Sequence, residues 1–129
     1  MASELRVDTL KDSSGNNSVG MSYVSNGSAK AFAHFDVDAV LDNSFNMSSA
    51  TDNGVGIFTV TNTNAFADAD FIVSGSVVGA TLSNYACFIT SNGSAKTSST
   101  APIKTYNYYD TLAVQDMHKM QVVEHGDLA

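Results

Sequence analysis

The fold is indicated most clearly by residues 52–61, which read Asp52-Asn53-Gly54-Val55-Gly56-Ile57-Phe58-Thr59-Val60-Thr61. The first three residues are turn formers, and the segment after them is rich in the β-branched and aromatic residues that favour strands. Just before this stretch, Phe45 and Met47 alternate with Asn and Ser, which places both apolar side chains on one side of a strand. Together the two segments predict a β-hairpin.

The same period-two alternation recurs along the whole chain. Further strands are expected at residues 4–9, 19–23, 29–37, 71–78, 85–90, 104–109 and 118–125. The dipeptide Asn26-Gly27 predicts a type I′ hairpin turn. The nearly continuous apolar start of residues 71–78 favours a central strand, and Met120 and Val122 are the expected inward residues of the last strand. Roughly eight short strands at this spacing predict an all-β fold, a small antiparallel β-sandwich of the jelly-roll-like kind.

Two details concern the surface of this sandwich. In residues 29–37, Phe35 lies on one face of the expected strand and Phe32 on the other, so each face is expected to contact a neighbouring surface. The hexapeptide at residues 25–30 recurs at residues 91–96. Because Asn-Gly-Ser is common turn chemistry and the flanking residues barely match, we interpret the copies as two hairpin tips rather than as a duplication.

Composition excludes several other classes of protein. Ser, Thr and Asn make up 39 of the 129 residues, whereas Leu occurs six times and Glu twice, which argues against a helical bundle. Six scattered bases against 13 acids give a net charge of −7 and offer no stripe that could neutralise nucleic-acid phosphates. No apolar run is long enough for a membrane helix, and the N-terminus lacks the apolar core of a signal peptide. The single cysteine, Cys87, excludes a disulfide framework and is expected to be a small buried hydrophobe.

Candidate chemistry is sparse. His34 lies beside Asp36 on one expected strand, and His118 and His125 should point to opposite faces of another, so they would not chelate a metal together. No nucleophile elbow, metalloprotease helix, phosphate loop or dinucleotide fingerprint is present, so we expect no enzyme and no cofactor. The Asp-x-Asp pairs at residues 36–38 and 68–70 leave calcium as an open alternative, although ordinary solvated loop acids are favoured.

Three tyrosines that are close together in sequence have two possible roles: Tyr106, Tyr108 and Tyr109. Alternate tyrosines on a strand can form a stacking platform for a sugar, or they can pack against a neighbouring subunit with the hydroxyl at the rim. We favour packing and keep the glycan contact as the alternative.

Several segments of the sequence resemble small tail-fibre and virion structural proteins of marine bacteriophages, especially cyanophages. These segments are residues 2–18, 28–32, 42–49, 51–60, 64–75, 104–107 and 126–127, whereas residues 80–101 show no specific resemblance. The resemblance implies a virion protein, with an N-terminal segment that docks on the particle or braids with its copies and a small β-sandwich behind it. It also implies a homotrimer, a state that two-faced strands with short polar side chains favour independently.

These considerations predict an attachment and oligomerisation arm at residues 1–24 and a β-sandwich domain at residues 25–129. Four apolar arm residues are expected to bury against neighbouring chains: Leu5, Val7, Leu10 and Val19. The expected function is that of a short trimeric tail-fibre or appendage component without enzymatic activity, located in the virion. Its expected partners are its own copies, other tail or capsid proteins and, in the glycan alternative, a host-surface glycan. A capsid decoration protein and a glycan-binding receptor-recognition module are the two alternatives.

Overall fold

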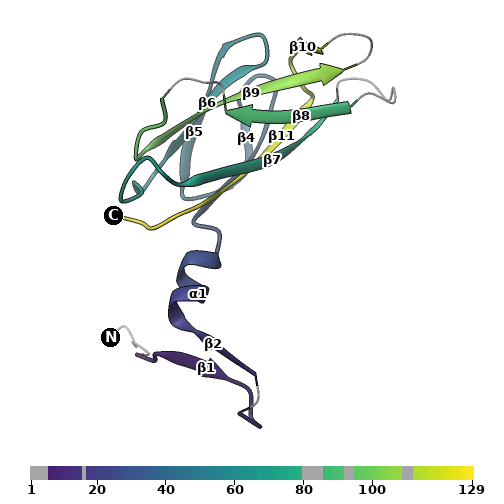
Figure 1. The fold of residues 1–129 in the computed structure, drawn as a ribbon. Helices are drawn as coiled ribbons and strands as arrows, with labels where there is room; N and C mark the ends of the chain where they lie inside the picture. The colour runs from purple at the N-terminus through teal and green to yellow at the C-terminus, as the bar shows by residue number, and fades with distance from the viewer. Residues whose placement is uncertain (1–5, 16, 80–85, 92–94, 109–111) are drawn as a thin grey trace.

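The computed structural model describes residues 6–15, 17–79, 86–91, 95–108 and 112–129. Within these ranges, eleven strands and one short helix are present, and the strands form three antiparallel sheets (Figure 1). The prediction of an all-β chain is therefore confirmed, although the strands are more numerous than the eight expected. No helix in the described ranges combines the length and the apolar character that crossing a membrane requires.

Two larger sheets face each other and form most of the molecule. The first sheet has the order β4-β3-β11-β7. The second sheet has the order β10-β9-β6-β5, and β8 also pairs with β9. Their strands are β3 (Ala31–Asp36), β4 (Leu41–Phe45), β7 (Ile72–Val78) and β11 (Lys119–His125) in the first sheet, and β5 (Met47–Gly54), β6 (Ile57–Asn62), β8 (Ala86–Ser91), β9 (Thr100–Tyr108) and β10 (Leu112–Val114) in the second.

The core lies between these two sheets, because each contributes the alternating inward residues that period-two strands provide. From the first sheet come Ala31, Ala33, Phe35, Met120 and Val122, and from the second come Phe58, Val60, Ala101 and Ile103. Phe35 and Phe58 meet edge to face across the gap, with ring centroids 5.6 Å apart. The inward positions predicted for Met120 and Val122 are confirmed, since both side chains are fully buried.

One end of the core is closed by a second aromatic pair. Phe66 and Phe71 stack with centroids 4.2 Å apart, and both are buried. Gly126 lies directly against them, because a Cβ atom there would come within 2.7 Å of Phe71. Glycine is therefore required for this close approach of the last strand to the rings.

The chain passes from the first sheet to the second at Asn46, between β4 and β5. Asn46 has a φ of 53°, and its side-chain oxygen accepts hydrogen bonds from both nitrogens of Asn64. This left-handed residue reverses the side-chain alternation. Phe45, expected on the same side as Met47, is consequently 56% exposed on the first sheet, whereas Met47 is buried.

The N-terminal part differs from the predicted pair of long strands. Here a short hairpin of β1 (Thr9–Lys11) and β2 (Ser18–Gly20) is followed directly by helix α1 (Met21–Gly27), so the strand expected at residues 19–23 and the hairpin turn at Asn26-Gly27 are both wrong. The first copy of the hexapeptide is thus the end of a helix and not a hairpin tip. The predicted boundary after residue 24 falls inside this helix.

The C-terminal end of α1 is stabilised by hydrogen bonds from the two residues Ser28 and Lys30 that follow it. The Ser28 amide donates to the Val24 carbonyl, and the Ser28 hydroxyl donates to the Ser25 carbonyl. The Lys30 ammonium donates to the same Ser25 carbonyl and, at 2.8 Å, to the Ser28 hydroxyl. Carbonyls at the end of a helix need such partners, and a cation there also favours the helix dipole. Gly27 is the last residue of the helix and has no positive φ, so Asn26-Gly27 here ends a helix through the contacts of Ser28 and Lys30 and not through a left-handed glycine.

The strand expected to be central, at residues 71–78, is also placed differently. β7 lies at the end of the first sheet, and Ile72 and Val78 are 65% and 50% exposed. The apolar start of this segment reflects the burial of Phe71, which precedes the strand and belongs to the aromatic pair at the end of the core. The two inner strands of the sheet are instead β3, which pairs with β4 and β11, and β11, which pairs with β3 and β7.

Candidate functional site

The segment formed by β1, β2 and α1, called the N-terminal arm from here on, extends away from the two main sheets (Figure 1). No residue of α1 is buried, and the β1 side chains are all exposed. Four of its apolar side chains are exposed: Leu10, Val19, Tyr23 and Val24, of which Tyr23 is the most open at 77%. Leu10 and Val19 are cross-strand partners and so lie on the same face of the hairpin.

Among the residues predicted for the arm, the structure thus brings Leu10 and Val19 together. Val7 is half-buried, and Leu5 lies outside the described residues. A two-stranded hairpin is marginally stable by itself, and a helix of seven residues is too short to be stable alone in water. An arm of this kind gains stability when its apolar side chains are covered.

A second candidate surface is the outer face of the first sheet. Strand pairing aligns Phe45, Phe32 and Val123 in one row across β4, β3 and β11. Phe32 and Phe45 stack with centroids 6.1 Å apart. Two residues further along each strand, a polar row contains Asn43, His34, Gln121 and Ser76. The two rows together are called the sheet-face groove. Between them lies a hollow of about 370 Å³, which is lined by Phe32 and Val123 of the first row and by His34, Asn43 and Gln121 of the second, with Phe45 stacked on Phe32 beside it.

Next to this groove, a β-bulge brings an extra acid onto the same face. His34 pairs with Asn43 and Phe35 pairs with Leu41, so Asp42 has no partner on β3. An extra residue of this kind redirects the side chains around it. The Asp42 carboxylate consequently reaches His34 and Lys119, and not merely its neighbours in sequence.

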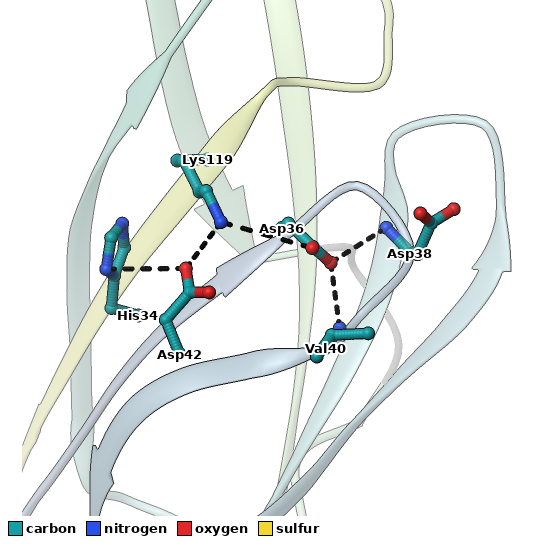
Figure 2. A network of polar contacts seen from close by, with 6 residues as sticks. All are labelled: His34, Asp36, Asp38, Val40, Asp42 and Lys119. Atoms are coloured by element: carbon teal, nitrogen blue, oxygen red, sulfur yellow. Dashed lines mark hydrogen bonds and ion pairs between the residues drawn. The ribbon is translucent and has the colours of Figure 1, made fainter.

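Figure 2 shows the polar network that results. Lys119 donates to Asp42 at 2.5 Å, its ammonium lies 3.9 Å from Asp36, and His34 Nδ1 lies 3.6 Å from the same Asp42 oxygen. The hydrogen bond from Lys119 lowers the pKa of Asp42, although desolvation opposes the shift. The sequence placed Asp36 two residues from His34 on the same strand, and in the structure the acid that His34 faces is Asp42 of the neighbouring strand.

The remaining acids with Asp-x-Asp spacing are used to hold turns. Asp36 Oδ1 accepts from the amides of Asp38 and Val40 (Figure 2), and Asp68 accepts from the amide of Asp70 in the same way. These are Asx turns, for which Asp is favoured without any cation. Over the described part of the chain, no group of three or more His, Cys, Asp or Glu side chains is placed to hold a metal ion.

The tyrosines and His125 lie apart from this network, whereas His118 is near enough for its charge to contribute to the lowered pKa of Asp42. Tyr106 and Tyr108 share one face of β9, where the Lys104 ammonium lies 5.6 Å from the Tyr106 ring and Tyr108 is 52% exposed. Tyr109 lies outside the described residues. His118 is exposed just before β11 and His125 is half-buried at its end. Cys87 belongs to β8, but its side chain is not among those described.

One buried polar pair was not predicted. Glu124 is fully buried on β11, and the Asn62 side-chain nitrogen donates to its Oε2 at 2.8 Å. The other oxygens of the pair, Glu124 Oε1 and Asn62 Oδ1, are buried and have no hydrogen-bond donor among the described residues. Burial raises the pKa of Glu124, while the Asn62 hydrogen bond and the nearby charge of Lys96 act in the opposite direction.

No protein-family model, curated protein or solved structure matches this chain.

Proposed function

We propose that this chain is a structural subunit of a bacteriophage virion, without enzymatic activity, and that it serves as a short tail-fibre or appendage component attached through its N-terminal arm. The observation that carries the proposal is the arm itself. It extends from the sandwich with no buried helix residue and with Leu10, Val19, Tyr23 and Val24 exposed. Exposed apolar side chains on a marginally stable segment are typical of a surface that another chain covers.

We further propose that the covering chains are copies of the same protein and that the assembly is a homotrimer. Leu10 and Val19 form an apolar pair on one face of the arm hairpin. Three such faces around a threefold axis would bury one another, as cyclic homo-oligomers do with a shared surface patch. The hairpin strands are three residues long and leave free backbone groups, so edge pairing with a neighbouring sheet can add to this contact.

The sandwich is proposed to be jelly-roll-like. The chain changes sheets between β4 and β5, between β6 and β7, between β7 and β8, and between β10 and β11. Repeated crossing between two antiparallel sheets supports this type of topology, in which strands that follow one another in sequence often belong to different sheets.

The oligomeric state tests the arm directly. The chain has a mass of 13.6 kDa, so light scattering coupled to gel filtration should give about 41 kDa for a trimer. The double variant Leu10→Lys and Val19→Lys should shift the protein to monomer, because it places charge on the proposed contact. The matched control is Thr9→Lys with Ser18→Lys, which adds the same charge to the opposite face of the hairpin.

A monomer at 100 μM for the unaltered chain would refute the proposed assembly, and so would equal effects of the two double variants. The virion location is tested separately by mass spectrometry of purified particles from the phage that encodes the chain. Its absence from those particles would contradict the structural role, even if the protein were trimeric in solution.

A further inference from the structure

The sheet-face groove has a chemical character that the proposed assembly does not use. It lies on the outer face of the first sheet and contains no residue of the N-terminal arm. One side is the apolar row with Phe32, Phe45 and Val123, and the other is the polar row with Asn43, His34 and Gln121. The rows are two residues apart along each strand, which corresponds to about 7 Å.

Hydrogen-bonding groups of the polar row remain available. Gln121 Oε1 accepts from the Ser76 hydroxyl at 2.8 Å, so its amide nitrogen is left to donate. Within the described part of the chain, the Asn43 side chain makes no hydrogen bond, and it carries both a donor and an acceptor. Only Nδ1 of His34 faces Asp42, which leaves the second ring nitrogen for a ligand.

The charged groups beside the groove are already paired with one another. Lys119 is held by Asp42 and Asp36, so among the described residues that border the groove no unpaired lysine or arginine is left to bind an anionic ligand. Lys119 offsets one of the two carboxylate charges, so the network keeps one net negative charge, which also disfavours an anion. Both carboxylates are already engaged, Asp42 by Lys119 and Asp36 by Lys119 and two backbone amides, which makes them poor partners for a cationic ligand. An entirely apolar ligand would cover the amides of Asn43 and Gln121 without satisfying them, and this loss is costly. The groove therefore selects for a neutral ligand with one apolar face and one edge of hydroxyl groups.

We propose that the sheet-face groove is a binding site for a neutral saccharide. A pyranose ring has an apolar face of C–H groups that can stack on Phe45 and Phe32, and its hydroxyls can exchange hydrogen bonds with Asn43, His34 and Gln121. The hollow of about 370 Å³ is at the small end of ligand sites and suits one or two sugar units. This site is distinct from the face of β9 that carries Tyr106 and Tyr108.

The test uses the full chain and a defined set of probes. Saturation-transfer NMR with the methyl glycosides of glucose, galactose, mannose and N-acetylglucosamine detects weak binding, and an array of neutral oligosaccharides extends the search. Phe45→Ala and Asn43→Ala should each weaken binding of the best probe roughly tenfold, which corresponds to the loss of one stacking contact or one paired amide.

Leu112→Ala is the matched control, because Leu112 is also 56% exposed but lies on β10 of the second sheet. It should leave saccharide binding unchanged, and circular dichroism should show all three variants folded. Failure of every neutral probe to bind at 10 mM would overturn the proposal, as would undiminished binding by both groove variants. Should Phe45→Ala change the oligomeric mass and not sugar binding, the face would be a contact between subunits and the saccharide site would be refuted. The arm variants Leu10→Lys and Val19→Lys leave the groove intact, so this outcome is separable from failure of the proposed assembly.

Discussion

Replacing Glu124 by Gln should stabilise the protein at neutral and alkaline pH. In the unaltered chain, Glu124 Oε1 and Asn62 Oδ1 are two buried acceptors without a donor among the described residues. A Gln side chain at position 124 can keep the hydrogen bond from Asn62 through its oxygen and donate from its nitrogen to Asn62 Oδ1. The substitution also removes a buried negative charge while preserving the size of the side chain.

The expected magnitude follows from those two acceptors. A buried polar atom left unpaired costs about 1–3 kcal/mol, so supplying one donor to the pair should raise the free energy of unfolding by roughly 2 kcal/mol at pH 8. With a urea dependence of about 1.5 kcal/mol per M, the unfolding midpoint should rise by about 1.3 M. This gain exceeds the effect of an ordinary surface substitution, which is usually within about 0.5 kcal/mol.

The gain should depend on pH in a defined direction. Because the pKa of Glu124 is raised above its ordinary value of 4.5, the folded state binds the proton more tightly than the unfolded state. The stabilisation by that proton is complete below pH 4.5 and is lost as the pH rises through the folded pKa. A protonated Glu124 can itself donate to Asn62 Oδ1, so the advantage of Gln should shrink at pH 4 and reach its full size at pH 8.

Urea unfolding followed by far-UV circular dichroism at pH 4, 6 and 8 measures this difference. Asp38→Asn is the control, since it converts an exposed acid to its amide and should leave the midpoint nearly unchanged at all three pH values. A Glu124→Gln protein that is less stable than the unaltered chain at pH 8, or whose gain is the same at pH 4 and pH 8, would refute the reasoning.

Three further predictions concern the core, a turn and the network in Figure 2. Phe58→Ala should lower the free energy of unfolding by about 3–5 kcal/mol in urea titration, because it empties the fully buried centre between the sheets. Gly56→Ala should destabilise by more than about 1 kcal/mol in the same assay, because φ is 62° and the added Cβ would lie 2.8 Å from the Gln115 carbonyl. Lys119→Met should raise the pKa of Asp42 toward 3.8, measured by carboxyl NMR titration, since the lowering hydrogen bond is lost. In the unaltered chain, ionised Asp42 stabilises the fold above pH 3.8, and this contribution is lost as the pH falls through its lowered pKa. The Lys119→Met variant should lack this loss of stability at acidic pH. An unchanged titration of Asp42 would show that the hydrogen bond from Lys119 does not lower its pKa.

The parts of the fold predicted correctly are those with an unambiguous local pattern. In β3 and β11 every second residue is buried, and the inward positions of Phe35, Met120 and Val122 follow from that period. The alternation of residue type is less regular than the alternation of burial, because Phe32 and Val123 are apolar on the outer face. The hairpin of β5 and β6 was predicted correctly, but its turn lies at Val55-Gly56, and the predicted turn residues Asp52, Asn53 and Gly54 are the end of β5. Each of these signals is local, so no knowledge of the remaining chain is needed to interpret it.

The errors occurred where local patterns were short or had two uses. Val19, Met21 and Tyr23 alternate over only five residues, and Asn-Gly suits a helix end as well as a hairpin turn. The decisive contacts come from Ser28 and Lys30, which cap the helix from outside the pattern. For β7, an apolar sequence could not distinguish a central strand from an edge strand that follows a buried aromatic residue.

The sheet-face groove could be anticipated only in part. The presence of Phe32 on the second face of its strand indicated a surface that meets something. Its partners, however, come from pairing β3 with β11, about ninety residues later, and from the bulge at Asp42, neither of which is visible in the local sequence. The arm residues Leu10 and Val19 were identified because apolar side chains in a short, turn-rich segment stand out in sequence.

The position of β11 has a consequence for how the domain is made. This strand follows every other strand in the chain, yet it lies between β3 and β7 in the finished sheet. A growing chain that has not yet reached Lys119 therefore has β3 and β7 with unpaired edges and an incomplete core. Unpaired strand edges of this kind can pair with other nascent chains. Folding of this domain can therefore be completed only after β11 has been synthesised, and agents that shield strand edges during translation should improve its yield more than agents that act on the completed protein.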